Sequence, residues 1–258
     1  MILKGMKMEL AEIWRYPVKS MQGEQLEQAA VGPGGIEGDR RWAVVDADTG
    51  VSLSAKRYAD LLRCRAWTTS RGVMIGLPDG REYLTDSPEV AQALSDLLQR
   101  AVTTRNSDAV KKIQHEFPKA VTEGAGEPFL FAPETEAFFD SAPLQLLTSA
   151  TLLELQKLLP ASAIHQTRFR PNFLVEAHDT GFIENDWVDK AVTLGSLKCE
   201  VFDNTRRCIM VALGQGKLPR DVDVIRTILK RNEGRAGVAL RTTESGVVQR
   251  GAKIALLD

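Results

Sequence analysis

Residues 61–85, LLRCRAWTTSRGVMIGLPDGREYLT, decide the fold class of this chain. Short apolar runs alternate there with turn signals, and Pro78-Asp79-Gly80 is a strong hairpin element. We therefore expect a strand, a turn, a strand, a turn and a strand. Short strands at such close spacing favour a small barrel or a sandwich.

The same pattern extends over much of the chain. Further strands are expected in segments 6–20, 172–177, 191–203, 206–213 and 236–258, where short apolar or alternating runs lie between turn signals. Segments 87–102, 149–160 and 220–232 have apolar residues at helical spacing, and Ser87 and Ser149 are the expected N-caps of the first two helices. Regular alternation of strands and helices is missing, so the sequence predicts an α+β fold that is predominantly β.

The length of 258 residues allows one large domain or two small ones. Periodicity is lost from about residue 104 to residue 136, and this stretch contains the loop-like segment EGAGEP at 123–128. We therefore expect a β-barrel-like domain over residues 1–125 and a second β-barrel domain with a few flanking helices over residues 126–258.

Composition excludes several classes of function. The net charge is −1, so no global field attracts nucleic acid or an anionic membrane, and we found no apolar run long enough to span a bilayer. Three scattered cysteines do not form a disulfide framework and fit a reducing compartment, which predicts a cytoplasmic protein. The three histidines are scattered as well, which argues against a structural zinc site.

Four short segments combine Lys or Arg with Ser, Thr or Asn, the residue types that hold phosphates: YPVKS (16–20), GDRRW (38–42), RFRPN (168–172) and NTRRC (204–208). A single segment of this kind is usually a solvated charge beside a turn. Four of them, each next to a Pro or Gly turn or close to a strand, favour an anion site built from loops. Thr148 and Ser149 open a predicted helix and add a helix N-terminus that suits an anion.

Cys208 follows two arginines and precedes the apolar run Ile209-Met210-Val211. Two interpretations are open. The cysteine is a core residue whose arginines point elsewhere, or the arginines hold an anionic ligand that the sulfur also contacts. Cys199 and Cys64 lie on apolar strand faces, and core packing is expected for both.

The order of these motifs resembles a known family. Residues 13–46 resemble the N-terminal β-barrel domain that precedes MOSC domains, and segments 140–155, 168–177, 187–211 and 246–256 resemble the MOSC domain itself, the module named after the C-terminus of molybdenum cofactor sulfurase. YPVKS, FRPN and Arg207-Cys208 in this order are together fairly specific. The domain order is that of the mitochondrial amidoxime-reducing component and similar bacterial proteins.

This resemblance implies a molybdenum cofactor, that is, molybdenum held by molybdopterin. It implies that Cys208 is the metal ligand and the catalytic residue. The positions that match cofactor-binding positions of the family are Lys19, Ser20, Arg40, Lys56, Thr148, Ser149, Arg170, Asn172 and Arg207. The residue chemistry agrees, because fork-shaped arginines suit a phosphate and a soft thiolate suits the metal. Many relatives have a second cysteine three positions before the ligand, where this chain has Thr205.

Three functions remain open at this point. The first is a reductase of small N-hydroxylated compounds. The chain has no cysteine cluster for an iron–sulfur centre, so electrons would come from a separate ferredoxin-type or flavoprotein-type partner. The second is a sulfur carrier with a persulfide on Cys208 for assembly of a metallosulfur cofactor. The third is a module that stores or transfers the cofactor without turnover.

Overall fold

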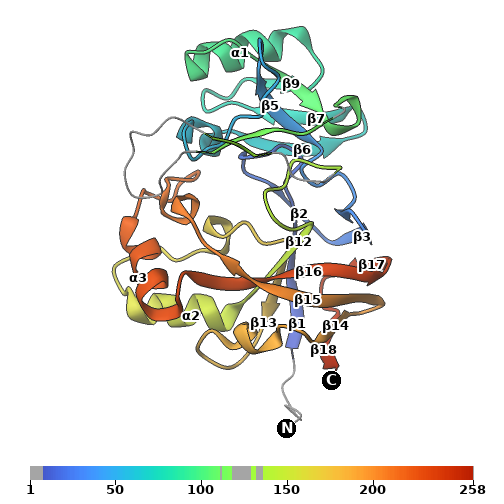
Figure 1. The fold of residues 1–258 in the computed structure, drawn as a ribbon, viewed down its shortest axis with the longest axis vertical. Coiled ribbons are helices and arrows are strands. Elements are labelled where there is room, and N and C mark those ends of the chain that lie inside the picture. The colour runs from blue at the N-terminus through green and yellow to red at the C-terminus, as the bar shows by residue number, and fades with distance from the viewer. Residues whose placement is uncertain (1–7, 111, 118–128, 132–135, 258) are drawn as a thin grey trace.

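We describe the fold from a computed structural model, which defines residues 8–110, 112–117, 129–131 and 136–257. Two parts are stacked along the long axis of the molecule (Figure 1). One part contains β5 to β9 and α1, and the other contains β1 and the strands and helices from β12 onward. The boundary expected between residues 125 and 126 lies outside the described residues.

The first part consists of small antiparallel sheets and one helix, α1 (Pro88–Leu98). Its strands pair as β6-β7-β8, β5-β9 and β10-β11. They are β5 (Trp42–Asp46), β6 (Arg65–Thr69), β7 (Gly72–Gly76), β8 (Glu82–Leu84), β9 (Val102–Asn106), β10 (His115–Phe117) and β11 (Phe129–Phe131). The strand–turn–strand–turn–strand prediction for 61–85 is confirmed as β6, β7 and β8, although the short 3-10 helix η1 (Ala59–Arg63) occupies its first residues.

The second part is a closed barrel of seven strands, in the order β13-β12-β16-β15-β14-β18-β1. Its strands are β1 (Met8–Arg15), β12 (Leu144–Thr148), β13 (Phe173–Glu176), β14 (Ala191–Leu194), β15 (Leu197–Arg206), β16 (Arg235–Glu244) and β18 (Lys253–Leu257). Strand β1 closes the barrel, because it pairs with β18 on one side and with β13 on the other. The β12–β13 pair is parallel, and helix α2 (Ser149–Leu158) lies in the crossover that a parallel connection requires.

A sheet of three short strands lies at one side of the molecule (Figure 1). Strand β3 (Gln28–Gly32) pairs with β17 (Gly246–Gln249) and with β4 (Gly35–Ile36). Strand β2 (Glu24–Leu26) pairs with β1. Within the segment GPGGIEG at 32–38, Pro33 and Gly34 form the turn between β3 and β4, and Gly35 has a φ of +94° that glycine adopts without strain.

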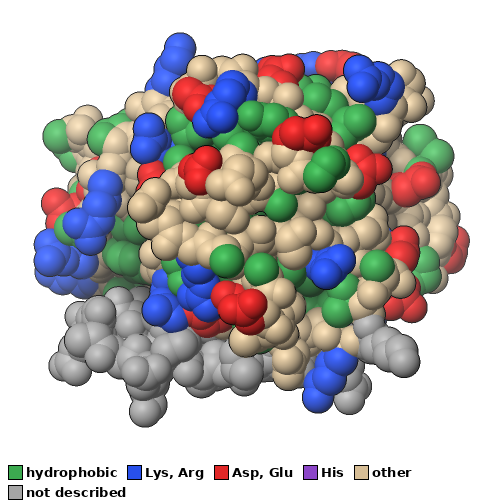
Figure 2. Space-filling model, turned by 90° about the horizontal axis from the view of Figure 1, so that it is seen from above, with side chains coloured by type: hydrophobic (Ala, Val, Ile, Leu, Met, Phe, Trp, Pro, Cys, Tyr) green, Lys and Arg blue, Asp and Glu red, His purple; other side chains and the backbone are tan. Residues whose placement is uncertain are grey.

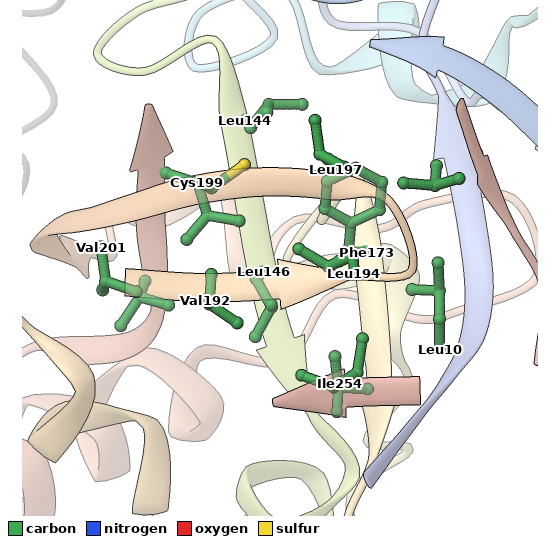
Figure 3. Packing of buried hydrophobic residues seen from close by; sticks show 14 of the residues in the cluster. Leu10, Leu144, Leu146, Phe173, Val192, Leu194, Leu197, Cys199, Val201 and Ile254 are labelled. Atoms are coloured by element: carbon green, nitrogen blue, oxygen red, sulfur yellow. The ribbon is translucent and has the colours of Figure 1, made fainter. Parts of the chain in front are cut away.

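The barrel is filled by alternate side chains of its strands. Figure 3 shows residues such as Leu10, Phe173 and Ile254 pointing toward one another from β1, β13 and β18. Cys199 lies among them and is fully buried, as the alternation in β15 predicts. A second core lies in the other part and contains buried Cys64, so both cysteines expected in the core are there.

The predominantly β, α+β class is confirmed, and so are the three long helices, whose third member is α3 (Val222–Asn232). Two local predictions are wrong. The N-cap of α2 is Thr148, whose hydroxyl accepts a hydrogen bond from the Thr151 N–H, so Ser149 is already inside the helix. The strand expected over 206–213 is not formed. Strand β15 ends at Arg206, and Ile209–Ala212 form the 3-10 helix η5.

Acidic and basic side chains are interspersed over the end of the molecule that carries α1 (Figure 2), as the small net charge leads one to expect. Within the described ranges, no helix combines the length and the hydropathy needed to span a bilayer.

Closure of the barrel by β1 makes a stability prediction. Leu10 of β1 is fully buried in the barrel core, so replacing Leu10 with Ala should lower the free energy of unfolding by about 3 kcal/mol. The matched control is Leu153→Ala in α2, because the Leu153 side chain is 54% exposed, and its cost should stay within about 0.5 kcal/mol. Urea unfolding of both variants measures the difference, and equal costs would contradict the role of β1.

Candidate functional site

A cavity of about 410 Å³ lies where the two parts of the molecule meet. This volume is in the range of small-molecule and cofactor sites. Among the residues that the structure describes, seven cationic side chains and one carboxylate, that of Asp140, line this cavity, which we call the basic cavity. Its cations are Lys19, Arg40, Lys56, Arg168, Arg170, Arg206 and Arg207.

Seven of the ten predicted site residues line the basic cavity. They come from sequence positions almost 190 residues apart: Lys19, Ser20, Arg40, Lys56, Arg170, Arg207 and Cys208. All four motif segments singled out in the sequence therefore contribute to one site. The other three predicted residues, Thr148, Ser149 and Asn172, are not among the lining residues.

Thr148 and Ser149 lie at the far end of β12. Gln145, near the start of that strand, lines the cavity, and three residues of extended chain separate it from Thr148 by roughly 10 Å. The Thr148 hydroxyl donates to Glu184 Oε2 at 2.6 Å, and the Ser149 hydroxyl donates to the Ala177 carbonyl at 3.0 Å. Both hydroxyls therefore form hydrogen bonds within the barrel and at the start of α2.

Asn172 does not line the basic cavity but holds two residues next to it in place, Asp39 and Gln145. Its amide nitrogen donates to Asp39 Oδ2 at 3.1 Å, and Asp39 in turn forms a buried ion pair with Arg40. The Asn172 side-chain oxygen accepts from the backbone N–H of Gln145 at 3.1 Å. Asn172 therefore fixes a counterion of Arg40 and the start of β12.

Tyr16 holds two of the arginines in place. The guanidinium carbons of Arg170 and Arg40 lie 4.3 Å and 4.8 Å from the centre of its ring, within reach of a cation–π interaction. The Tyr16 hydroxyl donates to the carbonyl of Pro171 at 3.1 Å, and burial raises the pKa of this phenol well above its usual value. The aromatic ring thus joins the YPVKS, GDRRW and RFRPN segments.

Backbone conformation marks the same site. Ser20, Arg40 and Arg170 have φ values of 66°, 50° and 53°, a left-handed region that costs energy for residues with a Cβ atom. All three line the basic cavity. Such strain is retained where the surrounding structure over-determines it, as at binding sites. Arg170 donates to the Met21 carbonyl at 2.5 Å, and its burial lowers its pKa to about 10.

One side of the basic cavity carries a lysine pair around a carboxylate. Asp140 forms ion pairs with both Lys19 and Lys56, and Lys19 also donates to the Phe138 carbonyl at 3.1 Å. Although burial opposes the charged form, the two ammonium groups hold the pKa of Asp140 far below its usual range. Burial lowers the pKa of Lys19. Behind this cluster, buried His115 has a pKa lowered to about 4 by burial and by the Lys19 charge.

Arg207 has three hydrogen bonds that fix its guanidinium. Nε donates to the Ala236 carbonyl at 2.6 Å, and Nη1 donates to the Phe169 carbonyl at 2.8 Å and to Gln145 Oε1 at 3.1 Å. Nη2 is buried and has no hydrogen-bond partner among the described residues. Burial lowers the pKa of Arg207 to about 10, and the nearby Cys208 opposes that shift. Because a buried donor without a partner is costly, Nη2 is suited to an anionic ligand in the cavity.

Cys208 differs from the other two cysteines. Its residue is partly exposed and lines the basic cavity, directly before the turn η5. Cys64 and Cys199 are buried, and burial raises the pKa of these thiols to about 12 and about 11. Thr205, which stands where many relatives have a cysteine, also lines the cavity, and its hydroxyl is buried without a hydrogen-bond partner among the described residues.

Arg168 has a different role from that of its neighbours. Its side chain is fully buried and donates to the carbonyls of Ala163, Val211, Leu213 and Pro219 at distances of 2.8 to 3.3 Å. These bonds hold η5 and the loop after it against the segment that carries Arg170. Arg168 therefore supports the position of Cys208 and adds positive charge to the site.

Comparison with known families agrees with this geometry. Residues 7–118 match the MOSC N-terminal beta barrel domain, and residues 133–255 match the MOSC domain. The chain is a MOSC protein. The basic cavity lies at the junction of its two MOSC-type domains, with Lys19, Arg40 and Lys56 on one side and Arg170 and Cys208 on the other.

Named relatives of this MOSC protein are distant. It is 24% identical over 231 residues to mitochondrial amidoxime-reducing component 1 of Homo sapiens, covering 79% of this chain and 66% of that protein. It is 23% identical over 263 residues to molybdenum cofactor sulfurase of Bos taurus, covering 87% of this chain and only 29% of the sulfurase. Among solved structures, the YUAD protein from Bacillus subtilis has the same fold, with a TM-score of 0.51 and 10% identity over 97% of this chain and 95% of that one.

Several site residues were missed in the sequence. Asp140 and Gln145 line the cavity of this MOSC protein but lie outside the four anion motifs, and Phe169 lies inside RFRPN without having been singled out. Tyr16 stands in YPVKS, where an aromatic residue beside a lysine is the available signal. No group of three His, Cys, Asp or Glu residues arranged to hold a metal occurs in the part of the chain that the structure describes.

The lowered pKa of His115 predicts a pH dependence of stability. The unfolded chain binds a proton at this histidine below about pH 6.5, whereas the native state does so only near pH 4. The unfolded state therefore holds more protons between these values, and the free energy of unfolding should fall by roughly 3 kcal/mol as the pH drops through this window. In His115→Gln the decrease should be smaller by that amount. Urea unfolding at pH 7, 5.5 and 4 measures it, and parallel curves would refute the prediction.

Proposed function

We propose that this chain binds a molybdenum cofactor in the basic cavity, with Cys208 as the protein ligand of the metal. One observation carries the proposal: a partly exposed thiol shares a cavity with seven cations, and one of them, Arg207, has a buried Nη2 without a partner among the described residues. A pterin with a phosphate and a dithiolene supplies dense negative charge and a soft metal, which these donors fit.

The proposed roles of the residues follow from their positions. Arg207 and Arg170 offer charged donors for the anionic part of the cofactor, and burial strengthens each such bond because water competes less. Tyr16 and Asn172 act through Arg40 and Arg170 and keep their guanidinium groups oriented before the cofactor binds. Lys19 and Lys56 add two further cations to the site, and Asp140 compensates part of their charge.

We further propose that the reaction is the reduction of small N-hydroxylated compounds. The amidoxime-reducing component, which matches 79% of this chain, supports this choice. When bound, the cofactor supplies a metal that exchanges an electron pair with the substrate. The protein supplies the thiol ligand and a cavity whose lining ranges from buried Lys19 to exposed Arg206. Electrons come from a separate electron-transfer protein of ferredoxin or flavoprotein type.

A sulfur carrier is the second candidate, and the similarity to molybdenum cofactor sulfurase favours it. In that case Cys208 carries a persulfide, and the adjacent arginines stabilise its negative charge. The two candidates use the same sulfur but differ in what the purified protein contains. Storage of the cofactor without turnover is the third candidate and shares its cofactor content with the first.

Replacing Cys208 with Ala tests the ligand assignment. Purified from a molybdate-replete host, the parent chain should contain near-stoichiometric molybdenum and pterin, and the variant should lose molybdenum by at least about tenfold because a direct ligand is gone. Elemental and pterin analysis measure this loss. Reduction of benzamidoxime with a competent electron donor then separates the reductase from the storage protein, and labile sulfur without metal would replace the proposal with the sulfur carrier.

Cys199→Ala is the matched control for Cys208→Ala. Cys199 is fully buried in the barrel core, so this change should cost about 1 kcal/mol of stability and leave the molybdenum content unchanged. Unchanged molybdenum in Cys208→Ala, or a loss of molybdenum in folded Cys199→Ala, would contradict the assignment.

A further inference from the structure

Glu184 is a buried carboxylate outside the basic cavity. It lies in the 3-10 helix η4 (Ile183–Trp187) and is fully buried. Its Oε2 accepts from the Thr148 hydroxyl at 2.6 Å, and its Oε1 accepts from the Thr151 hydroxyl at 2.6 Å and from the Gly237 N–H at 3.1 Å. Burial raises the pKa of Glu184, and these donors oppose the shift. Burying a carboxylate costs free energy, so the position of Glu184 needs a structural explanation.

The reason lies in an irregularity of the barrel wall. Asn204 pairs with Val238 and Arg206 pairs with Arg235, so that two residues of β16, Ala236 and Gly237, face only Thr205 on β15. This β-bulge turns the peptide group between the two residues out of the regular ladder. Its N–H reaches Glu184, and its C=O accepts from Arg207 Nε at 2.6 Å.

Glycine is required at the second position of the bulge. Gly237 has a φ of +80°, and a Cβ atom there would lie 2.6 Å from the Leu146 carbonyl oxygen and 3.0 Å from Arg207 Nη2. The backbone of Gly237 thus lies directly against the guanidinium. A single peptide group therefore joins the buried carboxylate to the arginine of the site. Its N–H donates to Glu184, and its C=O accepts from Arg207.

Hydrogen bonds in such a chain polarise one another and become stronger together. The carboxylate on the N–H side makes the Ala236 carbonyl a better acceptor for Arg207 Nε. With Nε held there and Nη1 held by Phe169 and Gln145, the remaining nitrogen, Nη2, is the one without a partner among the described residues.

We infer that Glu184 is a positioning residue for Arg207: through the Ala236–Gly237 peptide it fixes the guanidinium orientation that leaves Nη2 available to the anionic ligand of the basic cavity. The orientation itself is a property of the chain alone, and only the identity of the ligand rests on the proposed function. The inference also assigns Thr148 and Thr151 to this arrangement, since their hydroxyls orient Glu184.

The decisive measurement is solvent exchange at the Arg207 Nε–H, observed by nitrogen-15 NMR on the full chain and assigned by its absence in Arg207→Lys. In Glu184→Gln the charge is lost while size and shape are kept, and exchange at Nε–H should become about tenfold faster because the bond to Ala236 weakens. A folded Glu184→Gln protein with unchanged exchange overturns the inference.

Asp46→Asn is the matched control, because Asp46 is also a buried carboxylate that accepts hydrogen bonds from a threonine, and it lies in the other part of the molecule. Asp46→Asn should leave solvent exchange at the Arg207 Nε–H unchanged. If exchange becomes as fast as in Glu184→Gln, the effect is a general loss of stability and the inference is overturned. If Glu184→Gln does not fold, Thr151→Val decides, since it removes one donor to Glu184. Faster Nε–H exchange supports the inference, and unchanged exchange overturns it.

Cofactor content separates this inference from the proposed function. If the parent chain contains no molybdenum or pterin, the proposed function fails, while the Nε–H measurement still decides the role of Glu184. If the cofactor is present, Glu184→Gln alone should lower the cofactor content of the protein. The same change added to Arg207→Lys should cause no further loss, because both changes act on one group. Additive losses in the double variant overturn the positioning role.

Discussion

The pairing of β1 with β13 is the interaction on which the rest of the structure depends. Leu10 lies opposite Val175, and Ile13 lies opposite Phe173, so that the chain leaving β1 and the chain entering β13 run side by side. Residues that follow β1, such as Lys19, thereby meet residues that precede β13, such as Arg170, although about 150 positions separate them. The basic cavity exists because this one antiparallel register is fixed by a buried core.

A common principle organises the arginines of the cavity. Three of them donate to the protein itself: Arg170 to Met21, Arg207 to Ala236, Phe169 and Gln145, and Arg168 to four carbonyls. Guanidinium groups offer five donors in a fixed plane, so some can be committed to the scaffold while others remain for a ligand. The charge is thus oriented in advance, and binding does not have to order it.

Local sequence signals predicted much of the fold. Pro78-Asp79-Gly80 and its apolar flanks specified β7 and β8, and the helical stripe after Ser87 specified α1, because these features depend on neighbours in sequence. The errors occurred where two local solutions compete. Thr148 and Ser149 are both good caps, and tertiary contact with Glu184 selects Thr148. Ile209 to Val211 suit a strand, but they turn into η5 and pack against the cluster around α3.

The site was less predictable than the fold. Cationic residues beside turns could be recognised, since their type alone suggests an anion. The left-handed backbone of Ser20, the bulge at Gly237 and the burial of Glu184 depend on distant strands and have no local sign. Asp140 lies just after the stretch without periodicity at 104–136, and its importance follows only from the two lysines that the fold brings to it.

Barrel closure by β1 also has a consequence for biosynthesis. Met8 pairs with Ile254, so β1 leaves the ribosome about 250 residues before its partner β18 is made. At roughly 5–20 residues per second, that interval is on the order of 10–50 s. During this time the edge of β1 that later binds β18 is open to other chains, and its apolar face has no barrel to enter. Nascent-chain chaperones that cover extended apolar segments would therefore matter more for this topology than for one whose paired strands are close in sequence.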